Sequence, residues 1–139
     1  MLEAYIQQLA IDLDILDDIN DDELDCYKIP IEEGVSVTVQ ELRPGFNLFA
    51  TFTMFPQIEN TEILSTALMN ANLLGRGTGN ALIGLDENGK YLTLSQTITY
   101  EVNYHEFRDT LEDFVNTIDY WNGLVIEFSK TGNITLEVE

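Results

Sequence analysis

Residues 60–97 read NTEILSTALMNANLLGRGTGNALIGLDENGKYLTLSQT, a stretch that holds one helix, its stop signal and a hairpin in succession. Apolar residues recur at spacings of three and four after Asn60, which predicts a helix with one apolar face. Gly75 ends this helix, because glycine can adopt the left-handed conformation that closes one. Alternation from Ala81 and an Asn-Gly pair then predict a tight antiparallel hairpin that returns at Tyr91.

This helix also carries apolar residues outside its main stripe, namely Met69 and Leu73. One sheet covers one helix face, so a second apolar surface indicates a contact with a partner subunit. The alternative is a helix that packs only on its own sheet, because wide apolar stripes also occur in monomers. Both interpretations stay open at the level of the sequence.

The composition limits the classes of protein to consider. A chain of 139 residues is most simply one domain, and its content of 45% hydrophobic and 10% aromatic residues excludes a disordered chain. The chain has 25 Asp and Glu residues against 6 Lys and Arg residues, for a formal net charge of -19. This charge repels phosphate backbones and anionic membrane surfaces, which argues against binding of nucleic acid or lipid.

The sequence also bears on the compartment. Nothing at the N-terminus combines a basic region with the apolar run of a secretory signal, and the lone Cys26 has no partner for an internal disulfide. No window approaches the roughly 20 continuous apolar residues that a membrane-spanning helix needs. We therefore expect a cytosolic protein that does not insert into membranes.

The rest of the chain divides into helices and strands by the same patterns. Helical spacing predicts a first helix over 2–16. Asn103 and Glu106 form a capping box that begins a last helix, which is expected to run to about Val125. Between the first two helices the residues alternate as three strands do, over residues 24–32, 35–42 and 46–54. Pro30 cannot donate to a ladder, so the first of these strands should be an edge strand or be interrupted there.

The order of elements is helix, three strands, helix, two strands, helix. This order predicts an α+β fold with a twisted antiparallel sheet. Residues 1–128 form a single domain in this interpretation. Residues 129–139 are either an extra strand or a mobile tail, because apolar and polar residues alternate after the turn that begins at Thr131.

The first helix has apolar residues on two sides. A second line, which includes Ala4 and Ile11, lies opposite the main stripe. The helix is therefore buried on both sides, or part of it binds a ligand.

The third strand is apolar on two sides as well. Strict alternation places Phe52 and Met54 on one side of it, and Phe49 and Phe55 on the other. The second pair needs either a second covering layer or a ligand that fills a groove.

Several kinds of chemistry lack the residues they need. His105 is the only histidine and Cys26 the only cysteine, so zinc sites and catalytic triads have no complete set. The glycine run 75–79 follows a helix and opens a strand, the reverse of a phosphate-binding loop. The acidic run from Asp18 fails as a calcium loop because its sixth position is Glu23 rather than glycine. We predict no metal, no cofactor and no enzymatic activity.

Three stretches carry a resemblance to a known family. The run LLGRGTGNALIGLDENGKYLTLSQ from Leu73, the helix before it and EFRDTLEDFVNTIDYWN after it resemble the class I type III secretion chaperones, the Tir chaperone (CesT-like) family. The order of elements is similar from end to end, apart from the tail after about Ser129. The resemblance implies a homodimer of the bacterial cytoplasm that has no ATPase activity. It would bind the N-terminal chaperone-binding segment of one or more effectors and keep them soluble and secretion-competent.

The resemblance also implies two surfaces on this chain, and it allows the secretion ATPase as a further partner. The subunit interface would include Leu64, Leu68, Ala71, Ala81 and Ile83. The effector-binding surface would include Leu9, Leu13, Leu16, Phe49 and Phe55. An adaptor of the secretion apparatus that binds a structured partner is the alternative function. A protomer that buries Leu68, Phe49 and Leu13 together would contradict the chaperone hypothesis.

Overall fold

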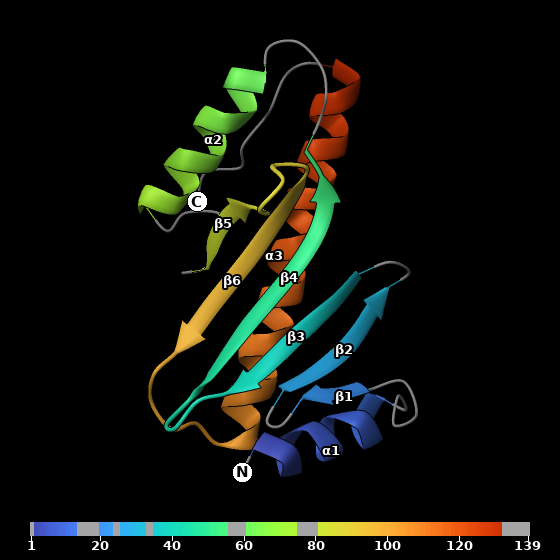
Figure 1. Cartoon of the computed structure of the whole chain (residues 1–139), viewed down its shortest axis with the longest axis vertical. Helices are drawn as coiled ribbons and strands as arrows, with labels where there is room; N and C mark the ends of the chain where they lie inside the picture. The colour runs from blue at the N-terminus through green and yellow to red at the C-terminus, as the bar shows by residue number, and fades with distance from the viewer. Residues whose placement is uncertain are drawn as a thin grey trace.

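The structure is a computed structural model. It describes residues 2–13, 20–23, 26–32, 35–55, 61–74 and 81–131. The helices are α1 (Leu2–Leu13), α2 (Thr61–Leu74) and α3 (Tyr104–Thr131). The strands are β1 (Asn20–Glu23), β2 (Cys26–Glu32), β3 (Val35–Glu41), β4 (Phe46–Met54), β5 (Leu82–Leu85) and β6 (Tyr91–Ile98). Within the described residues the strands form one antiparallel sheet in the order β1-β2-β3-β4-β6-β5 (Figure 1).

The α+β class, the antiparallel sheet and the three helices predicted from the sequence are confirmed. One strand was not predicted. The four residues of β1, which begin at Asn20, add a short strand beside β2 at one edge of the sheet. Their sequence, Asn-Asp-Asp-Glu, has no apolar alternation and consists of poor strand formers, so the pattern alone could not indicate a strand there.

Pro30 lies within β2 and pairs with Ser36 of β3, so the strand is not interrupted at the proline. The described pairing of β1 with β2 lies at Lys28 and Cys26 and stops short of Pro30. The register between β2 and β3 shifts only after the proline, between Pro30 and Glu32.

The β5–β6 hairpin has the predicted Asn-Gly turn. Gly89 has a φ of 67°, which a glycine adopts without strain, and its N–H donates to the carbonyl oxygen of Asp86 at 3.0 Å. A carboxylate oxygen of Asp86 accepts a further hydrogen bond from the N–H of Lys90 at 2.9 Å. Asp86 therefore fixes the turn from both its main chain and its side chain.

The core lies between α3 and one face of the sheet (Figure 1). β4 contributes its even-numbered residues from Phe46 to Ala50, and α3 contributes large side chains that include Phe107, Phe114 and Trp121. Each such side chain stabilises the fold by ~1.5–3 kcal/mol when it is fully buried. α1 packs beside the start of α3, and α2 lies beside β5 at the other end of the molecule (Figure 1).

The prediction that the last helix ends near Val125 is wrong. α3 continues to Thr131, and Phe128 on its last turns is 0% exposed. Gly123 disfavours a helix by only ~1 kcal/mol relative to alanine, which the burial of one phenylalanine outweighs. The expected domain boundary at residue 128 therefore falls inside α3, and residues 132–139 lie outside the described residues.

The ends of the first two helices are described only in part. α1 is described to Leu13, so the predicted extension to Leu16 lies outside the described residues. The same holds for the predicted cap at Asn60 and for the stop signal at Gly75 with its glycine run.

Candidate protein-interaction site

The face of the sheet opposite the core, here called the outer face, carries a row of residues aligned by strand pairing. The row consists of Lys28, Thr38, Phe49, Ser95 and Leu82. Directly paired residues point to the same face, and their neighbours along β4 are buried in the core. On the outer face, by contrast, Phe49 is 41% exposed and Leu82 is 60% exposed. Two large apolar side chains therefore stand in one row on an open sheet face.

A β-bulge adds a second apolar pair to this face. The register between β4 and β6 shifts between Thr51 and Thr53, which brings Met54 opposite Tyr91. Both side chains are exposed. The sequence analysis placed Met54 on the core side by strict alternation, but one extra residue in a strand reverses the facing of every residue after it.

The four residues Phe49, Leu82, Met54 and Tyr91 are called the outer-face cluster below. Between the two pairs lies a row of Thr51, Thr93 and Gly84. Neighbouring rows on one face are about 7 Å apart, so the cluster spans about 14 Å.

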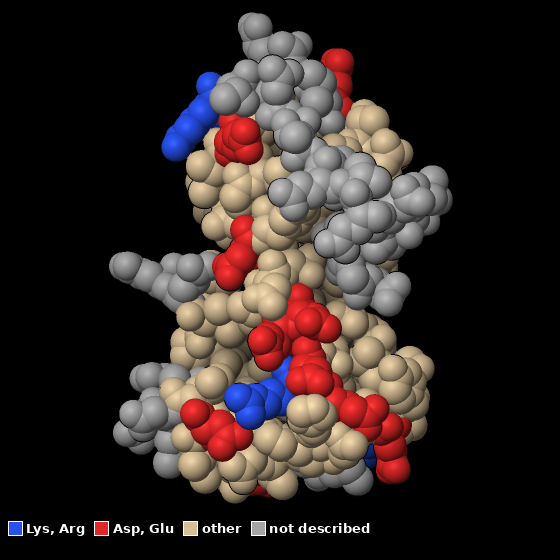
Figure 2. Space-filling model, turned by 180° about the vertical axis from the view of Figure 1, so that it is seen from behind, with Lys and Arg blue, Asp and Glu red and all other residues tan. Residues whose placement is uncertain are grey.

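The outer-face cluster lies in the uncharged part of the chain. β4, β5 and β6 contain no charged residue. Residues 42–85 contain two acidic and two basic residues, so the formal charge of -19 lies in the segments before and after them. Figure 2 shows acidic side chains gathered on the other side of the molecule, chiefly where α3 begins. Interface cores are depleted in charge, so this segregation is a signal that the sequence analysis missed.

The predicted effector-binding residues occupy different environments. Phe49 belongs to the outer-face cluster, and Leu13 is 51% exposed at the end of α1. Leu9 is buried in the core of the protomer, and Leu16 lies outside the described residues. Phe55 is partly buried and packs against the core, because the β-bulge before it reverses its facing relative to Phe49. The structure therefore does not bring these residues together on one surface.

The predicted subunit-interface residues pack inside the protomer. The buried residues are Leu64, Leu68, Ala81 and Ile83, and the side chain of Ala71 lies outside the described residues. Among the described side chains of α2 and β5, the exposed large apolar ones are Met69, Leu82 and Leu85. Leu68 is 7% exposed whereas Phe49 and Leu13 are open, so the arrangement that would contradict the chaperone hypothesis is not found.

The second apolar line of α1 is not covered in the protomer. Ala4 and Ile11 are both exposed. Of the two alternatives for this helix, burial on both sides is therefore wrong for the protomer, and the line is open to a partner.

Polar contacts hold α1 against α3. The Asp12 carboxylate accepts hydrogen bonds from the Tyr104 hydroxyl at 2.6 Å and from Gln8 Nε2 at 2.9 Å. Arg108 lies 3.8 Å from the same carboxylate. The hydrogen bond from Tyr104 lowers the pKa of Asp12, while burial and this carboxylate raise the pKa of Tyr104 to about 12. Tyr5 on α1 also donates to the carbonyl oxygen of Val102 at 2.8 Å.

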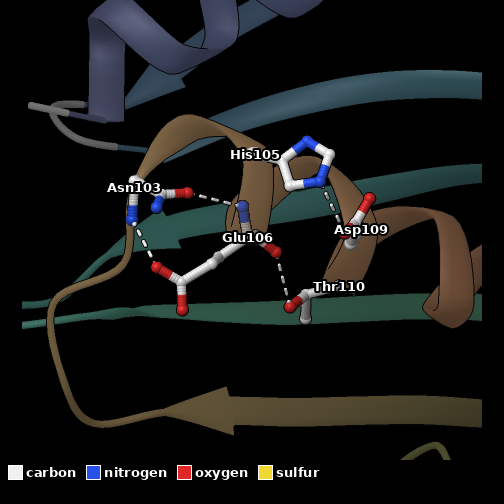
Figure 3. A network of polar contacts seen from close by, with 5 residues as sticks. All are labelled: Asn103, His105, Glu106, Asp109 and Thr110. Carbon is white, nitrogen blue, oxygen red and sulfur yellow. Dashed lines mark hydrogen bonds and ion pairs between the residues drawn. The ribbon is translucent and has the colours of Figure 1, made fainter.

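The predicted capping box at the start of α3 is confirmed (Figure 3). The Glu106 N–H donates to Asn103 Oδ1 at 2.8 Å, and the Asn103 N–H donates to Glu106 Oε1 at 3.1 Å. His105 points away from the sheet, with Nε2 3.3 Å from an Asp109 carboxylate oxygen (Figure 3). This histidine therefore sits on the surface of the first turn of α3.

Among the residues that the structure describes, no three His, Cys, Asp or Glu side chains are grouped so that they could hold a metal ion. None of the described helices is long and apolar enough to cross a membrane.

Residues 4–122 match the model of the Tir chaperone protein (CesT) family. A protein of Chlamydia pneumoniae is 30% identical over 122 residues, which cover 87% of this chain and 93% of that protein.

Solved structures with a similar fold cover nearly the whole chain. The crystal structure of the ExsC–ExsE complex superposes with a TM-score of 0.67 at 16% identity, over 89% of this chain and 92% of that one. The HopA1–SchA chaperone–effector complex gives a TM-score of 0.62 at 14% identity, over 94% of each chain. The crystal structure of YbjN from E. coli gives a TM-score of 0.54 at 14% identity, over 98% of this chain and 96% of that one. At these identities the likeness establishes the fold alone.

Proposed function

Because the chain belongs to the Tir chaperone protein (CesT) family, we propose that it acts as a type III secretion chaperone. It binds the N-terminal segment of one or more effector proteins in the bacterial cytoplasm and keeps them soluble and competent for secretion. Its role is binding rather than catalysis. The family match over residues 4–122 is the observation that carries this conclusion, and the similar fold of a chaperone–effector complex supports it.

The outer-face cluster is the proposed client-binding surface. An unfolded segment loses ~1–2 kcal/mol of backbone entropy for each residue that binding fixes. Burying the four half-exposed side chains of the cluster returns on the order of 5 kcal/mol. This offsets the ordering of only a few residues, so the client must also gain from main-chain pairing at a sheet edge. The exposed line of Ala4 and Ile11 on α1 extends the apolar surface available to it.

The proposed homodimer keeps α2 and β5 as its interface elements. β5 is the edge strand next to β6, and its exposed Leu85 and the exposed Met69 of α2 are the proposed contacts. Leu64, Leu68 and Ile83 support these elements from beneath. Two copies of a chain with a charge of -19 repel each other, so they meet at least cost through segment 42–85, which has no net charge.

Client binding is tested by producing the chain together with candidate secreted proteins and mapping the protected region by limited proteolysis. A chaperone protects a stretch near the client's N-terminus that has no compact fold of its own. Protection of a folded domain would instead indicate an adaptor. The secretion ATPase, a further proposed partner, can be added to the purified complex to test whether it binds only the loaded chaperone.

Phe49→Asp tests the surface itself. A charge in the middle of the apolar row should weaken client binding at least tenfold, which corresponds to about 1.4 kcal/mol. Affinity is measured by titration calorimetry, and thermal unfolding shows whether the variant is folded. Ile126→Asp is the matched control, because Ile126 is similarly exposed but lies on α3. Equal affinity of both variants would remove Phe49 from the client-binding surface.

A further inference from the structure

A cavity of about 830 Å³ lies at the end of the molecule where α1 begins. It is lined by the first turn of α1, by residues 41–46 at the β3–β4 turn and by residues 99–102 between β6 and α3. None of the predicted site residues lines it. Its volume falls within the range of cavities that bind small ligands and short peptides.

The walls of this cavity are held in place by hydrogen bonds between distant segments. The N–H of Leu2 donates to Glu41 Oε1 at 2.8 Å, which ties α1 to β3. The Tyr5 hydroxyl donates to the carbonyl oxygen of Val102 at 2.8 Å, which ties α1 to the segment before α3. The cavity therefore exists before a ligand arrives, and binding does not have to order its walls.

The β3–β4 turn forms a rigid wall. The Leu42 N–H donates to the carbonyl oxygen of Gly45 at 3.0 Å and closes the turn. Gly45 has a φ of 96°, and a Cβ there would lie 1.8 Å from the carbonyl oxygen of Ile98. Only glycine permits this close approach of the turn to the end of β6.

The lining combines apolar surface with carboxylates. Tyr5, Pro44 and Tyr100 supply rings, and Glu41 and Glu101 supply two negative charges. Among the lining residues that the structure describes, Arg43 is the only basic one, and its Nε lies 3.4 Å from Glu41 Oε2 while its side chain is 77% exposed. A long aliphatic stem that ends in a cation matches such a site, because the rings contact the stem and the carboxylates bind the charge.

We infer that this cavity binds a short basic peptide segment, whose arginine or lysine side chain enters between Tyr5 and Tyr100 and binds the carboxylates of Glu41 and Glu101. Charge complementarity selects this occupant, because the chain carries -19 and the lining has two carboxylates against one guanidinium. Arg43 occupies part of the site in the free protein and moves aside when the segment binds. The inference rests on the proposed function in one respect, that the segment belongs to a client.

The test uses a peptide and needs no client. Acetyl-Leu-Arg-Arg-Leu-amide is titrated into the isotope-labelled full chain, and its shifts are followed by NMR beside those of acetyl-Leu-Gln-Gln-Leu-amide, which has the same length but no charge. The expected result is a set of shifts confined to residues 2–5, 41–46 and 99–102, produced by the arginine peptide alone. Shifts that are absent, scattered over the acidic surface or equal for the two peptides would overturn the inference.

Two variants of the lining and one control variant test the inference further. Glu101→Gln should weaken binding at least threefold, whereas Glu87→Gln in the β5–β6 turn removes the same charge elsewhere and should leave it unchanged. Arg43→Ala should tighten binding at least twofold, since it removes the competing cation. Equal weakening by both glutamine variants would indicate attraction to the net charge alone and would count against the inference. Weaker or unchanged binding by Arg43→Ala would contradict the displacement of Arg43 by the peptide and would also count against it. Such a failure leaves the client-binding test at Phe49 unaffected.

Discussion

At the scale of single residues, the contact between α1 and α3 depends on the protonation states of Asp12 and Tyr104. The lowered pKa of Asp12 means that its contribution to stability is present above its ordinary pKa of 3.8 and is lost as the pH falls through the lower folded value. The raised pKa of Tyr104 affects stability at alkaline pH. Its contribution is present below its ordinary pKa of 10.0 and is lost as the pH rises from there toward about 12.

Tyr104→Phe isolates this contact because it keeps the ring and removes the hydroxyl donor. We expect its melting temperature to lie a few degrees below that of the unchanged chain at pH 8, where the hydrogen bond to Asp12 is intact. The difference should shrink as the pH rises above 10, because Tyr104 of the unfolded parent chain then ionises while the folded one, with its raised pKa, does not, and this favours unfolding of the parent alone. Thermal melts followed by circular dichroism from pH 8 to above pH 10 measure the difference in melting temperature. Tyr91→Phe, at an exposed site on the outer face, is the control, and a constant difference for Tyr104→Phe would contradict the assignment.

At the scale of elements, the length of α3 is the clearest difference between the sequence-based prediction and the structure. Helical spacing continues through Val125 to Phe128, so the sequence does contain the signal for the longer helix. The two ends of β4 also differ in how well alternation predicts which residues are buried. Alternation correctly placed Phe46 and Phe49, whereas a single extra residue after Thr51 reversed the facing of Met54 and Phe55. This bulge has no signature in the alternation pattern, because Phe52, which the β4–β6 pairing skips, is apolar between two threonines and keeps the alternation regular up to Met54.

Phe128→Ala tests whether the last turns of α3 belong to the core. Deleting a fully buried phenylalanine side chain costs ~3–5 kcal/mol of unfolding free energy, because the lost contacts leave a cavity. Urea denaturation with an unchanged m-value measures this loss. Ile126→Ala, two residues away on the exposed side, should change the free energy by less than about 0.5 kcal/mol. A similarly small effect for Phe128→Ala would mean that the helix ends before it in solution.

The candidate site shows that sequence periodicity does not predict which apolar residues are exposed. Periodicity identified which positions of α2 are apolar, but Leu64 and Met69 are equally apolar and only the fold decides which one is covered. The same limit applies to Leu9 and Leu13, which share the predicted helix face although the first is buried and the second is exposed. Local spacing specifies a helix face; coverage depends on contacts between segments far apart in the chain.

At the scale of the whole molecule, the proposed dimer can be tested by mass. Light scattering on the purified chain at tens of micromolar should give about twice 15.8 kDa. Leu85→Asp should give a monomer, because a buried and unpaired charge in the interface is costly. Ile126→Asp changes a similarly exposed residue on α3 and should stay dimeric. A monomeric parent chain would remove α2 and β5 as an interface.

The uneven placement of charge along the chain has an effect that begins before any contact forms. Residues 42–85 are neutral overall and the flanking segments are strongly acidic, so the negative charge is distributed unevenly along the chain. Within a Debye length, another copy is repelled less by the neutral segment than by the acidic segments, whereas a cationic chain is attracted to the acidic segments. The charge distribution therefore favours some orientations of approach while the molecules are still separated by water. Added salt should weaken this preference, because it screens the charges.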